Sequence, residues 1–298
     1  MGMSAEDLEQ LIGLLGRSPV AVITGAGLST GSGIPAYRDP HGQWQHSQPI
    51  QHQDFLKSAA TRRRYWARSF VGWPTMANAT PNAGHKALAK LQFGGIVSTV
   101  ITQNVDGLHH ATGSQSIIEL HGGIRQVCCL SCKAKFSRSQ VQEWLKDANP
   151  DFDHDPARTA RLAPDGDAHL VDTVYARFTV PDCPECAGLL KPDVVFFGDN
   201  VPRERVVAAQ QIVEAAKALL VVGSSLMVYS GYRFAEQAHR LGKPVVAINQ
   251  GITRADHLLA LKIERDCGLA LSAVVAELVD NCTIGRNADV REGLLYDV

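Results

Sequence analysis

Short runs of apolar residues alternate with amphipathic segments along most of the chain. The apolar runs lie at 20–24, 96–102, 117–120, 194–197, 219–223 and 245–249. Between several of them apolar residues recur at helical spacing, as at 82–91, 203–218 and 231–241. Strands that are apolar throughout and separated by helices are typical of a parallel sheet covered on both faces. The pattern predicts an α/β fold with a doubly wound parallel sheet, in which ligands bind beyond the carboxyl ends of the strands.

Two regions interrupt this alternation. Residues 40–80 are rich in Gln, His, Trp and Arg and contain one amphipathic helical pattern near 55–70. Residues 125–189 hold five of the cysteines and a polar stretch at 151–167, which we expect to lie on the surface. We predict that the two regions form a second, smaller domain, made of a helical module and a metal-binding ribbon. Residues 1–39, 81–124 and 190–298 then form a Rossmann-like nucleotide-binding domain.

Composition and charge narrow the function classes. Of the 298 residues 45% are hydrophobic and 20% are charged, and 29 basic against 30 acidic side chains give a net charge of −1. This balance argues against nucleic acid or an anionic membrane as a partner, because both need a basic surface. No apolar run approaches the roughly 18 residues of a membrane span, and the first ten residues contain no apolar signal core. We expect a cytoplasmic protein, and its odd number of cysteines, seven, favours thiols or metal ligands over disulfides.

Two Cys-x-x-Cys pairs, Cys129 with Cys132 and Cys183 with Cys186, predict one metal centre. Each pair presents two thiolates, and together they complete a closed tetrahedral zinc site, which leaves no open position and is therefore structural. The spacer of 50 residues between the pairs is longer than the roughly 15–20 residues of a simple ribbon. A redox function of one pair is the alternative. Cys128 gives a Cys-x-x-x-Cys spacing with Cys132, so we assign Cys129 as the ligand.

The first apolar run leads directly into the glycine-rich sequence Gly25-Ala26-Gly27, which lets the backbone approach a phosphate closely. The loop departs from the fingerprint of hydride-carrier sites, because Thr30 stands at its sixth position and no acidic residue ends a strand about 20 residues later. A reusable hydride cofactor is therefore disfavoured. Arg38 is placed either to meet a diphosphate or to pair with its neighbour Asp39.

Polar residues follow two further apolar runs. Asn104 and Asp106 come after 96–102, and their two-residue spacing lets both side chains point the same way, toward a ribose or a carboxamide. His121 follows 117–120 and is well placed as a general base. The alternatives are an Asn/Asp turn for the pair and a structural role for the histidine.

Taken together, these motifs resemble the sirtuins, which are NAD-consuming protein deacylases. The resemblance covers about residues 20–269. It rests on GAGLSTGSGIPAYRD, TQNVDGLH, ELHG, the paired CxxC, KPDVVFFGD, VGSSL and VVAINQG, in the order of the family. Residues 65–74 and 223–233 are most similar to the class II branch.

The resemblance implies NAD as a co-substrate and one structural Zn²⁺. The residues that it assigns to NAD are Gly25, Ala26, Gly27, Ser29, Tyr37, Arg38, Gln103, Asn104, Val105, Asp106, Gly223, Ser224, Ser225, Asn249, Gln250, Gly251 and Cys267. The zinc ligands are Cys129, Cys132, Cys183 and Cys186, and the catalytic residues are His121 and Asn104.

The resemblance also implies acylated lysine proteins or peptides as substrates. Their backbone adds as a strand between Phe197–Gly198 and Met227–Val228, and the acyl-lysine enters a tunnel near His121. In the family mechanism the acyl oxygen attacks C1′ of the ribose and nicotinamide leaves. His121 then takes a proton through the ribose hydroxyls, and the products are free lysine and 2′-O-acyl-ADP-ribose.

Several features depart from the usual family pattern. Ala36-Tyr37 replaces Asp-Phe, and the usual Val-x-Pro-Ala is Val228-Tyr-Ser-Gly231. Tyr65 and Arg68 have the spacing with which the acidic-acyl branch binds a carboxylate, but the neighbouring arginines favour the alternative, one turn of an amphipathic helix. The alternative functions are a protein mono-ADP-ribosyltransferase and a deacylase that prefers longer or acidic acyl groups. We expect a monomer.

Overall fold

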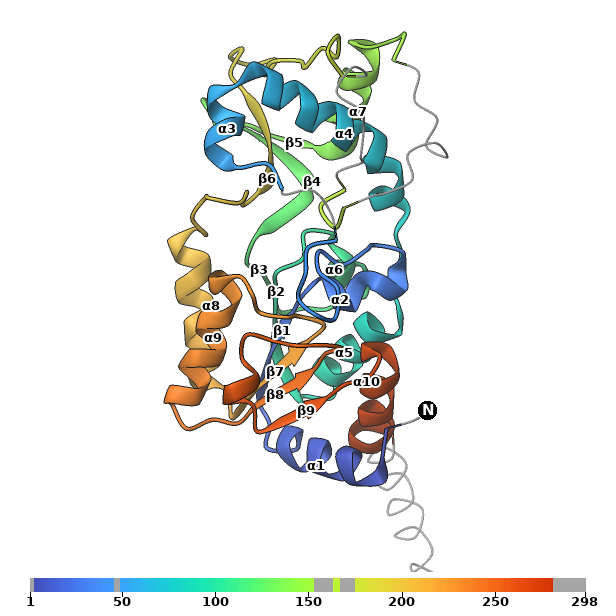
Figure 1. Ribbon diagram of the computed structural model, residues 1–298, viewed down its shortest axis with the longest axis vertical. Coiled ribbons are helices and arrows are strands. Elements are labelled where there is room, and N and C mark those ends of the chain that lie inside the picture. Colours follow the sequence, from blue (N-terminus) through green and yellow to red (C-terminus); the bar gives the residue numbers. More distant parts are fainter. Residues whose placement is uncertain (1–2, 46–48, 153–162, 167–174, 281–298) are drawn as a thin grey trace, which may run out of the picture.

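The computed structural model describes residues 3–45, 49–152, 163–166 and 175–280, which form a larger and a smaller lobe (Figure 1). The larger lobe contains a six-stranded sheet in the order β3-β2-β1-β7-β8-β9, in which every pair of neighbours is parallel. Its strands are β1 (Val20–Thr24), β2 (Val97–Thr102), β3 (Ile117–Glu119), β7 (Ala218–Val222), β8 (Val245–Ile248) and β9 (Leu261–Ile263). The predicted parallel sheet is confirmed, and β9 is a strand that the apolar pattern did not reveal.

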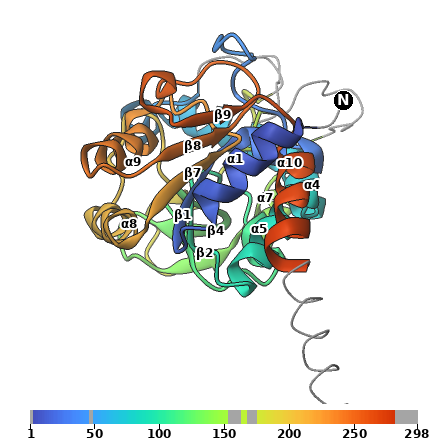
Figure 2. The same ribbon diagram turned by 90° about the horizontal axis from the view of Figure 1, so that it is seen from below.

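Helices cover both faces of this sheet (Figure 2). Successive residues of a strand point to opposite faces, so Val20 and Val22 pack in one buried cluster while Ala21 and Ile23 pack in another. The first cluster includes residues of α1 (Ala5–Leu15), α5 (Ala83–Phe93) and α10 (Cys267–Val275), and the second includes residues of α8 (Arg203–Ala215) and α9 (Tyr229–Arg240). The sheet is therefore doubly wound. Within the described ranges, no helix combines the length and the apolar character needed to cross a membrane.

The order of the strands reverses at β1. The chain continues from β1 to β2 and β3 on one side, and it returns to β7 on the other side of β1. The loops that leave the carboxyl ends of β1 and β7 consequently diverge, which opens a crevice at the top of the sheet. Gly25 follows β1 and Gly223 follows β7, so both glycine-containing motifs lie at this point.

The start of α5 fixes the loop that follows β1. Asn82 caps this helix: its side-chain oxygen accepts hydrogen bonds from the backbone N–H groups of Gly84 and His85. The amide nitrogen of Asn82 donates to the carbonyl oxygen of Leu28 at 2.7 Å. One side chain thus joins a helix end in the larger lobe to the short helix α2 (Ala26–Ser29) of the glycine-rich loop.

The smaller lobe is built from both interruptions of the alternating pattern. Its three-stranded antiparallel sheet has the order β5-β4-β6, with β4 (Gly122–Cys129), β5 (Lys135–Ser137) and β6 (Leu190–Val194). The helices are α3 (His52–Lys57), α4 (Ala59–Asn78) and α7 (Arg138–Asp147). Trp66 of α4 donates a hydrogen bond from its indole N–H to the carbonyl oxygen of Leu190 in β6. Residues from both sequence regions share one buried cluster.

Three predictions of local structure need correction. The strand expected at 194–197 does not belong to the parallel sheet. Val194 instead ends β6, which pairs with β4 in the smaller lobe, and the next apolar residues, Phe196 and Phe197, line a cavity. The helix expected near 55–70 is two helices that meet at Ser58, which caps α4. The limits predicted for the two domains, at residues 39/40, 80/81, 124/125 and 189/190, stay predictions.

The third correction concerns the polar stretch at 151–167. Residues 153–162 and 167, like Cys282, lie outside the described residues. Within residues 163–166, Pro164 and Gly166 are buried instead of lying on the surface. A Cβ at Gly166 would lie 2.8 Å from Met76 and 3.2 Å from Ile124, so this turn packs tightly against the smaller lobe.

Candidate active site

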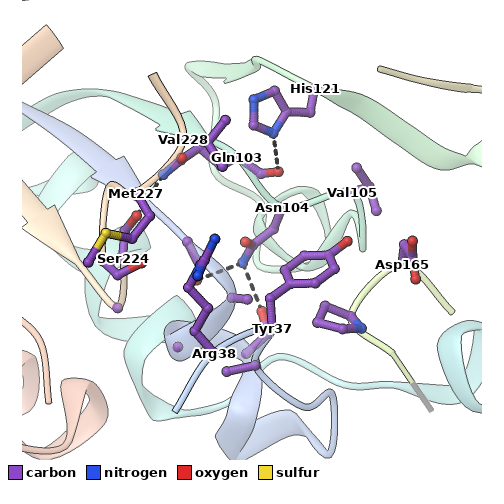
Figure 3. A pocket seen from close by; sticks show the side chains of 18 of the residues that line it. Tyr37, Arg38, Gln103, Asn104, Val105, His121, Asp165, Ser224, Met227 and Val228 are labelled. Carbon is purple, nitrogen blue, oxygen red and sulfur yellow. Dashed lines mark hydrogen bonds between the residues drawn. The ribbon is translucent and has the colours of Figure 1, made fainter. Parts of the chain in front are cut away.

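A cavity of about 630 Å³ opens at the carboxyl edge of the parallel sheet, below the smaller lobe (Figure 3). Residues after β1, β2 and β7 form one side of it, and Phe196 and Phe197 form part of another. The predicted site residues that line it are Gly25, Ala26, Gly27, Ser29, Tyr37, Arg38, Tyr65, Gln103, Asn104, Val105, Asp106, His121, Phe197, Gly198, Gly223, Ser224, Ser225, Met227, Val228, Asn249, Gln250 and Cys267. Gly251 and Arg68 do not line it. Gly251 lies against Pro40 instead, where a Cβ would meet backbone atoms at 2.2–2.6 Å.

The glycines after β1 and β7 interlock. A Cβ on Gly25 would lie 2.7 Å from the Cβ of Ser224, and one on Gly27 would lie 2.8 Å from the carbonyl oxygen of Gly223. Gly223 has a φ of +57°, and a Cβ there would lie 2.2 Å from the backbone nitrogen of Leu28. Any side chain at these positions would push the two loops apart. The close approach leaves backbone rather than side chains facing the cavity, as a dinucleotide site requires.

Asn104, Ser29 and Asp106 form a connected polar cluster. The amide nitrogen of Asn104 donates to the carbonyl oxygen of Gly25 and to the hydroxyl of Ser29, both at 3.0 Å. The Ser29 hydroxyl in turn donates to one carboxylate oxygen of Asp106 at 2.7 Å, and the other oxygen accepts the backbone N–H of Leu108 at 2.9 Å. All three side chains are buried. The two-residue spacing of Asn104 and Asp106 therefore does bring both groups to the cavity, where they also fix the loop after β1.

Gln103 connects this cluster to the loop after β7. Its side-chain amide donates to the carbonyl oxygen of Thr24 at 3.1 Å and to the hydroxyl of Ser224 at 2.8 Å. Gly231, in the first turn of α9, lies directly against this amide, because a Cβ there would lie 2.3 Å from the side-chain oxygen of Gln103. The end of β2 and the start of α9 are thus packed together.

His121 lies in the turn between β3 and β4 and faces the cavity (Figure 3). Its Nδ1 lies 3.0 Å from the carbonyl oxygen of Gln103, and its Nε2 lies 2.8 Å from the hydroxyl of Ser230. Burial lowers the pKa of His121 to about 4, the hydrogen bond with Gln103 opposes this shift, and the charge of Arg205 adds to it. The imidazole is therefore neutral near pH 7, which is the protonation state that a general base needs.

Aromatic rings form the entrance of the cavity beside the glycine-rich loop. The rings of Tyr37, Trp44 and Phe197 meet edge to face, with centroids 5.7–6.2 Å apart. The guanidinium of Arg38 stacks on Trp44 at 4.1 Å and donates to the carbonyl oxygen of Gly42 at 2.7 Å. Asp39 instead accepts backbone N–H groups of its own turn. Arg38 therefore does not pair with Asp39, and its contact with a diphosphate stays a prediction.

Tyr65 and Arg68 are not brought together at the cavity. Tyr65 is 4% exposed, lines the cavity and packs its ring against Phe55 and Phe196. Arg68, one turn later in α4, lies outside the lining. A carboxylate-binding role of the pair stays a prediction.

Cys267 is buried at the start of α10 and also lines the cavity. Burial raises the pKa of its thiol to about 12, so the side chain is a neutral thiol and not a nucleophile. It forms part of the cavity wall, and its contact with NAD stays a prediction.

Many lining residues were not among the predicted ones, and two groups of them bear on the proposed chemistry. Ser230 was passed over, although the departure from Val-x-Pro-Ala marked its position, and it contacts His121 directly. Pro164 and Asp165 also line the cavity, although they belong to a stretch that composition alone placed on the surface. No periodic pattern marks such a turn, because its contacts with the cavity depend on the tertiary fold.

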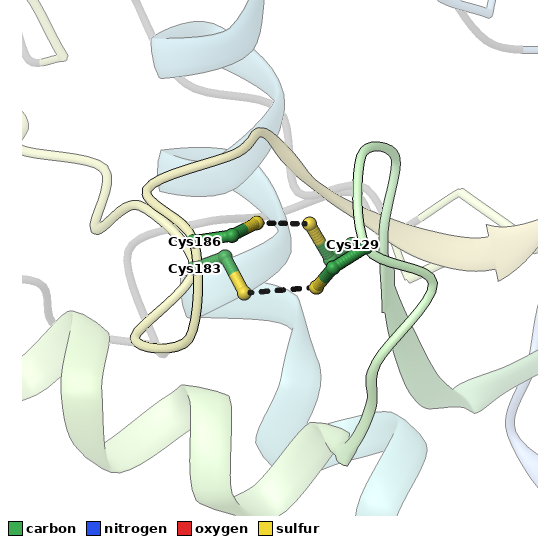
Figure 4. Close-up of side chains that lie close together, drawn as sticks. Cys129, Cys183 and Cys186 are labelled. Atoms are coloured by element: carbon green, nitrogen blue, oxygen red, sulfur yellow. Dashed lines mark hydrogen bonds between the residues drawn. The ribbon is translucent and has the colours of Figure 1, made fainter.

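Four cysteines from two turns of the smaller lobe lie close together (Figure 4). Each of Cys129, Cys132, Cys183 and Cys186 offers one sulfur atom, and all four atoms lie within 4.8 Å of one another. The distances of 3.5 Å between Cys129 and Cys186 and 3.8 Å between Cys132 and Cys183 match the separation of about 3.8 Å that a tetrahedral site with Zn–S bonds of about 2.3 Å requires. Cys128 is not part of the cluster, so the choice of Cys129 is confirmed.

The surroundings of the cluster also fit a thiolate-bound ion. The backbone N–H of Ser131 points to the sulfur of Cys129 at 3.4 Å, a contact that stabilises a thiolate. A Cβ on Gly188 would lie 2.9 Å from the same sulfur, so the turn needs a glycine to close around the site. The four residues would hold Zn²⁺ in a closed site and join the two cysteine turns, which is a structural role.

Comparison with known proteins identifies the family. Residues 25–230 match the sequence model of the Sir2 family. The chain belongs to the Sir2 family. The chain is 51% identical over 277 residues to an NAD-dependent protein deacetylase of Bordetella bronchiseptica, covering 93% of this chain and all of that protein. It is 46% identical to NAD-dependent protein deacetylase 1 of Streptomyces coelicolor, covering 91% and 90% of the two chains.

Solved Sir2 structures share the fold. A structure of Sir2 with a p53 peptide and NAD⁺ superposes with a TM-score of 0.73 at 31% identity, over 91% of this chain and 98% of the other. A structure of Sir2 bound to an acetylated peptide gives 0.72 at 30% identity, with the same coverage. The α/β fold with a smaller, zinc-binding and helical part, predicted from the sequence, is therefore confirmed.

Proposed function

We propose that this chain is an NAD-dependent protein lysine deacylase. It moves the acyl group of an N6-acyl-lysine to the ADP-ribose part of NAD and releases nicotinamide. The observation that carries the proposal is the meeting, in one cavity, of a backbone-lined nucleotide crevice with a buried, neutral histidine. The Sir2 relatives named as NAD-dependent protein deacetylases support the reaction class.

The nucleotide side of the cavity binds through its backbone. The interlocked glycines at Gly25, Gly27 and Gly223 let the diphosphate approach without a steric barrier, and Arg38 supplies a cation beside them. The residues after β8, Asn249 and Gln250, continue this wall. When bound, NAD would supply the ribose, a hydroxyl oxygen of which receives the acyl group, and it would be consumed because nicotinamide leaves.

The polar cluster suits the charge that the reaction creates. Breaking a glycosidic bond builds positive charge on the sugar, which amide oxygens and a carboxylate stabilise better than cations do. Asn104 and Asp106 provide these groups, and Ser29 holds them together. Asn104 therefore orients the sugar and Asp106 stabilises its charge.

His121 acts as the base. The carbonyl oxygen of Gln103 can only accept, so Nδ1 carries the proton and Nε2 carries the lone pair. The Nε2 atom takes a proton from a sugar hydroxyl, which makes the sugar oxygen nucleophilic toward the acyl carbon. Phe197 and Tyr37 cover the entrance and limit the access of water.

The acyl side of the cavity is mostly apolar. Tyr65, Ile124, Val194 and Phe196 contribute to its wall, and this surface fits acetyl as well as longer neutral acyl chains. Asp165 adds a carboxyl group to the wall, and this group offers no attraction to an acidic acyl chain. We therefore favour neutral acyl groups over the acidic ones that the spacing of Tyr65 and Arg68 had suggested.

The proposal is tested with an acetyl-lysine peptide and NAD, with the products followed by mass spectrometry. We expect deacylated peptide, nicotinamide and 2′-O-acetyl-ADP-ribose in equal amounts. Deacylation in the absence of NAD, or undiminished turnover in His121→Ala, would refute the proposed mechanism.

A panel of acetyl, longer neutral and succinyl peptides ranks the acyl groups in the same assay. A succinyl preference that Arg68→Met abolishes would restore the carboxylate role of Arg68. ADP-ribose attached to protein in place of free acyl-ADP-ribose would favour the transferase alternative. A monomeric state, a cytoplasmic location and the absence of nucleic acid partners complete the proposal.

A further inference from the structure

The Nε2 atom of His121 already has a partner in the protein without substrate. The hydroxyl of Ser230 lies 2.8 Å from it. Because Nδ1–H donates to Gln103, Nε2 of the neutral ring can only accept, so the Ser230 hydroxyl must be the donor. This hydrogen bond uses the lone pair that the proposed mechanism assigns to a sugar hydroxyl.

We infer that Ser230 is a positioning residue that covers the proton-accepting nitrogen of His121 until the sugar of NAD displaces it. This inference rests on the proposed function. A neutral imidazole has one lone pair in its plane, so the serine hydroxyl and the sugar hydroxyl compete for the same site. The carbonyl oxygen of Gln103 holds Nδ1 on the other side of the ring, so the ring keeps its orientation when the serine is displaced.

Ser230 lies where a bound sugar could replace its hydrogen bond to His121. The residue lies in the first turn of α9, directly after Val228 and Tyr229, which line the cavity mouth and are 40% and 53% exposed. The next residue, Gly231, is held against the Gln103 side chain, and the carbonyl oxygen of Gln103 holds the other side of the imidazole. Residues 230 and 231 therefore form one unit with the base, and this unit replaces the usual Pro-Ala of the family.

The hydrogen bond from Ser230 should change the pKa of His121, which a side chain that only fills space would not do. A donor to Nε2 stabilises the neutral ring and lowers its pKa, as do burial and the charge of Arg205 on α8. In Ser230→Ala we expect the pKa of His121 to rise by roughly 0.5 to 1, the effect of one lost hydrogen bond. Ser230→Thr keeps the hydroxyl and is expected to keep the pKa.

The measurement is an NMR titration of histidine-labelled protein without NAD or peptide, with His121→Gln used to assign the signal. An unchanged His121 pKa in Ser230→Ala would overturn the inference. Because this titration needs no turnover, its result does not depend on whether the proposed function is correct.

The kinetic arm tests displacement. With the competing donor removed, kcat/KM for NAD is expected to rise about two- to fivefold in Ser230→Ala and to stay at the wild-type value in Ser230→Thr. A value below wild type in Ser230→Ala would show that the hydroxyl assists catalysis, and this would overturn the competition. If the wild-type protein consumes no NAD with the peptide, the proposed function fails instead.

A separate observation concerns two arginines beside an exposed tyrosine at the cavity mouth. The guanidinium carbons of Arg233 and Arg254 lie 5.1 and 5.7 Å from the ring centre of Tyr229. Arg233 lines the cavity, and Arg254 donates to the carbonyl oxygen of Met227. Among the described residues, no carboxylate lies within ion-pair distance of either one, and the nearby Asp256 instead binds Thr253 and Lys262.

We also propose that this surface recognises an acidic side chain close to the acyl-lysine of the substrate protein. Two uncompensated cations held against a tyrosine ring attract a carboxylate at the cavity mouth, while the apolar faces of Val228 and Tyr229 contact the neighbouring chain. This inference, too, rests on the proposed function.

The test uses acetyl-lysine peptides in pairs. The two peptides of a pair carry Glu or Gln at one position, and the pairs cover the two positions before and the two positions after the lysine. We expect one Glu peptide to have a kcat/KM roughly two- to fivefold above its Gln counterpart, with a smaller ratio at high salt. The double variant Arg233→Gln/Arg254→Gln should bring the ratio to about one. Arg240→Gln, at the far end of α9, is the matched control and should keep it. A ratio of one in the wild type, or an unchanged ratio in the double variant, would overturn the inference, while loss of all turnover with NAD would count against the proposed function.

Discussion

The two sides of the cavity are built in different ways. The side that we assign to the nucleotide is formed around backbone: loops after adjacent strands of one sheet, with glycines packed so closely that a single methyl group would separate them. The acyl side consists of side chains from several distant segments, including α4, β6 and the turn at 163–166. The first side depends on short sequence motifs, whereas the second depends on how the smaller lobe folds and is held in place. Substitutions should therefore act locally on the first side and through the smaller lobe on the second.

The largest effect is expected from removing a zinc ligand. Cys129→Ser or Cys186→Ser leaves three thiolates, and structural zinc sites contribute about 10–16 kcal/mol of apparent binding energy that is coupled to folding. We expect loss of zinc and loss of a cooperative thermal transition of the smaller lobe, measured by metal analysis and calorimetry. Cys128→Ser is the matched control, because this thiol lies outside the cluster, and it should retain one zinc per chain. Full zinc retention in a ligand variant would contradict the assignment.

The next largest effect is expected at the base. His121→Ala removes the proposed proton acceptor and should lower kcat/KM about 10²- to 10⁴-fold, with the fold and the zinc content unchanged. The measurement is steady-state kinetics with an acetyl-lysine peptide at saturating NAD. A loss smaller than threefold would assign the proton transfer to another group.

A glycine substitution tests the backbone-built side alone. In Gly27→Ala the new methyl group would lie 2.8 Å from the carbonyl oxygen of Gly223, which is backbone and cannot move away as a flexible side chain does. We expect NAD affinity to fall by about ten- to a hundredfold and stability to fall by roughly 1–3 kcal/mol. Titration calorimetry and urea unfolding measure the two effects.

Gly13→Ala provides the control for this substitution. Gly13 lies within α1 and its Cβ would meet no atom within 4 Å, so alanine there should stabilise the helix by roughly 0.5–1 kcal/mol without changing NAD affinity. Equal NAD affinities of Gly27→Ala and the wild type would mean that the glycine loop does not contact the nucleotide.

The smallest effect is expected from moderate acid. The proposed base, His121, needs its deprotonated form, and because its pKa is lowered to about 4, it stays deprotonated as the pH falls from 7 to 5.5. Its contribution to kcat/KM should change less than about twofold in this range, whereas a histidine with a pKa of 6.5 would lose about eightfold. The measurement is kcat/KM against pH, with circular dichroism confirming that the protein stays folded. If kcat/KM falls with a midpoint near pH 6.5 and this fall is absent in a His121 variant, the ring is not shielded from water.

Acid should also lower stability, which sets the limit of that experiment. His85, His109 and His121 have folded-state pKa values lowered to about 4, 3 and 4, with burial as the main cause. The unfolded chain binds protons at these groups below about pH 6.5, so unfolding is favoured as the pH falls from 6.5 toward 4. Urea unfolding at pH 7 and 5.5 should show the loss.

The sequence was informative where local pattern determines structure. Strands β1, β7 and β8 are apolar because both of their faces are buried, and the helical pattern at 82–91 corresponds to α5. The cysteine spacing identified the metal cluster, and strand-end polar residues such as Asn104 and His121 located the cavity, because parallel strands end at one edge.

The sequence was less informative where distant segments meet. An apolar run such as 194–197 has the same appearance whether it joins a sheet or lines a cavity. Here Val194 ends a strand of the smaller sheet, and Phe196 and Phe197 line the cavity. Asp165 lies in a polar stretch, and its place in the cavity wall depends on packing against Met76 and Ile124. The contact of Ser230 with His121 joins residues 109 positions apart, which no local rule connects.

The smaller lobe is made of two separate insertions into the larger one, and this arrangement affects how the protein comes apart. The polypeptide crosses between the lobes several times, so cutting any one crossing leaves them tied by the others. A protease that nicks a single linker should yield two fragments that migrate apart in denaturing gels and yet elute together under native conditions. Neither lobe is a contiguous piece of chain. Neither can therefore be produced alone by truncating the chain at one point.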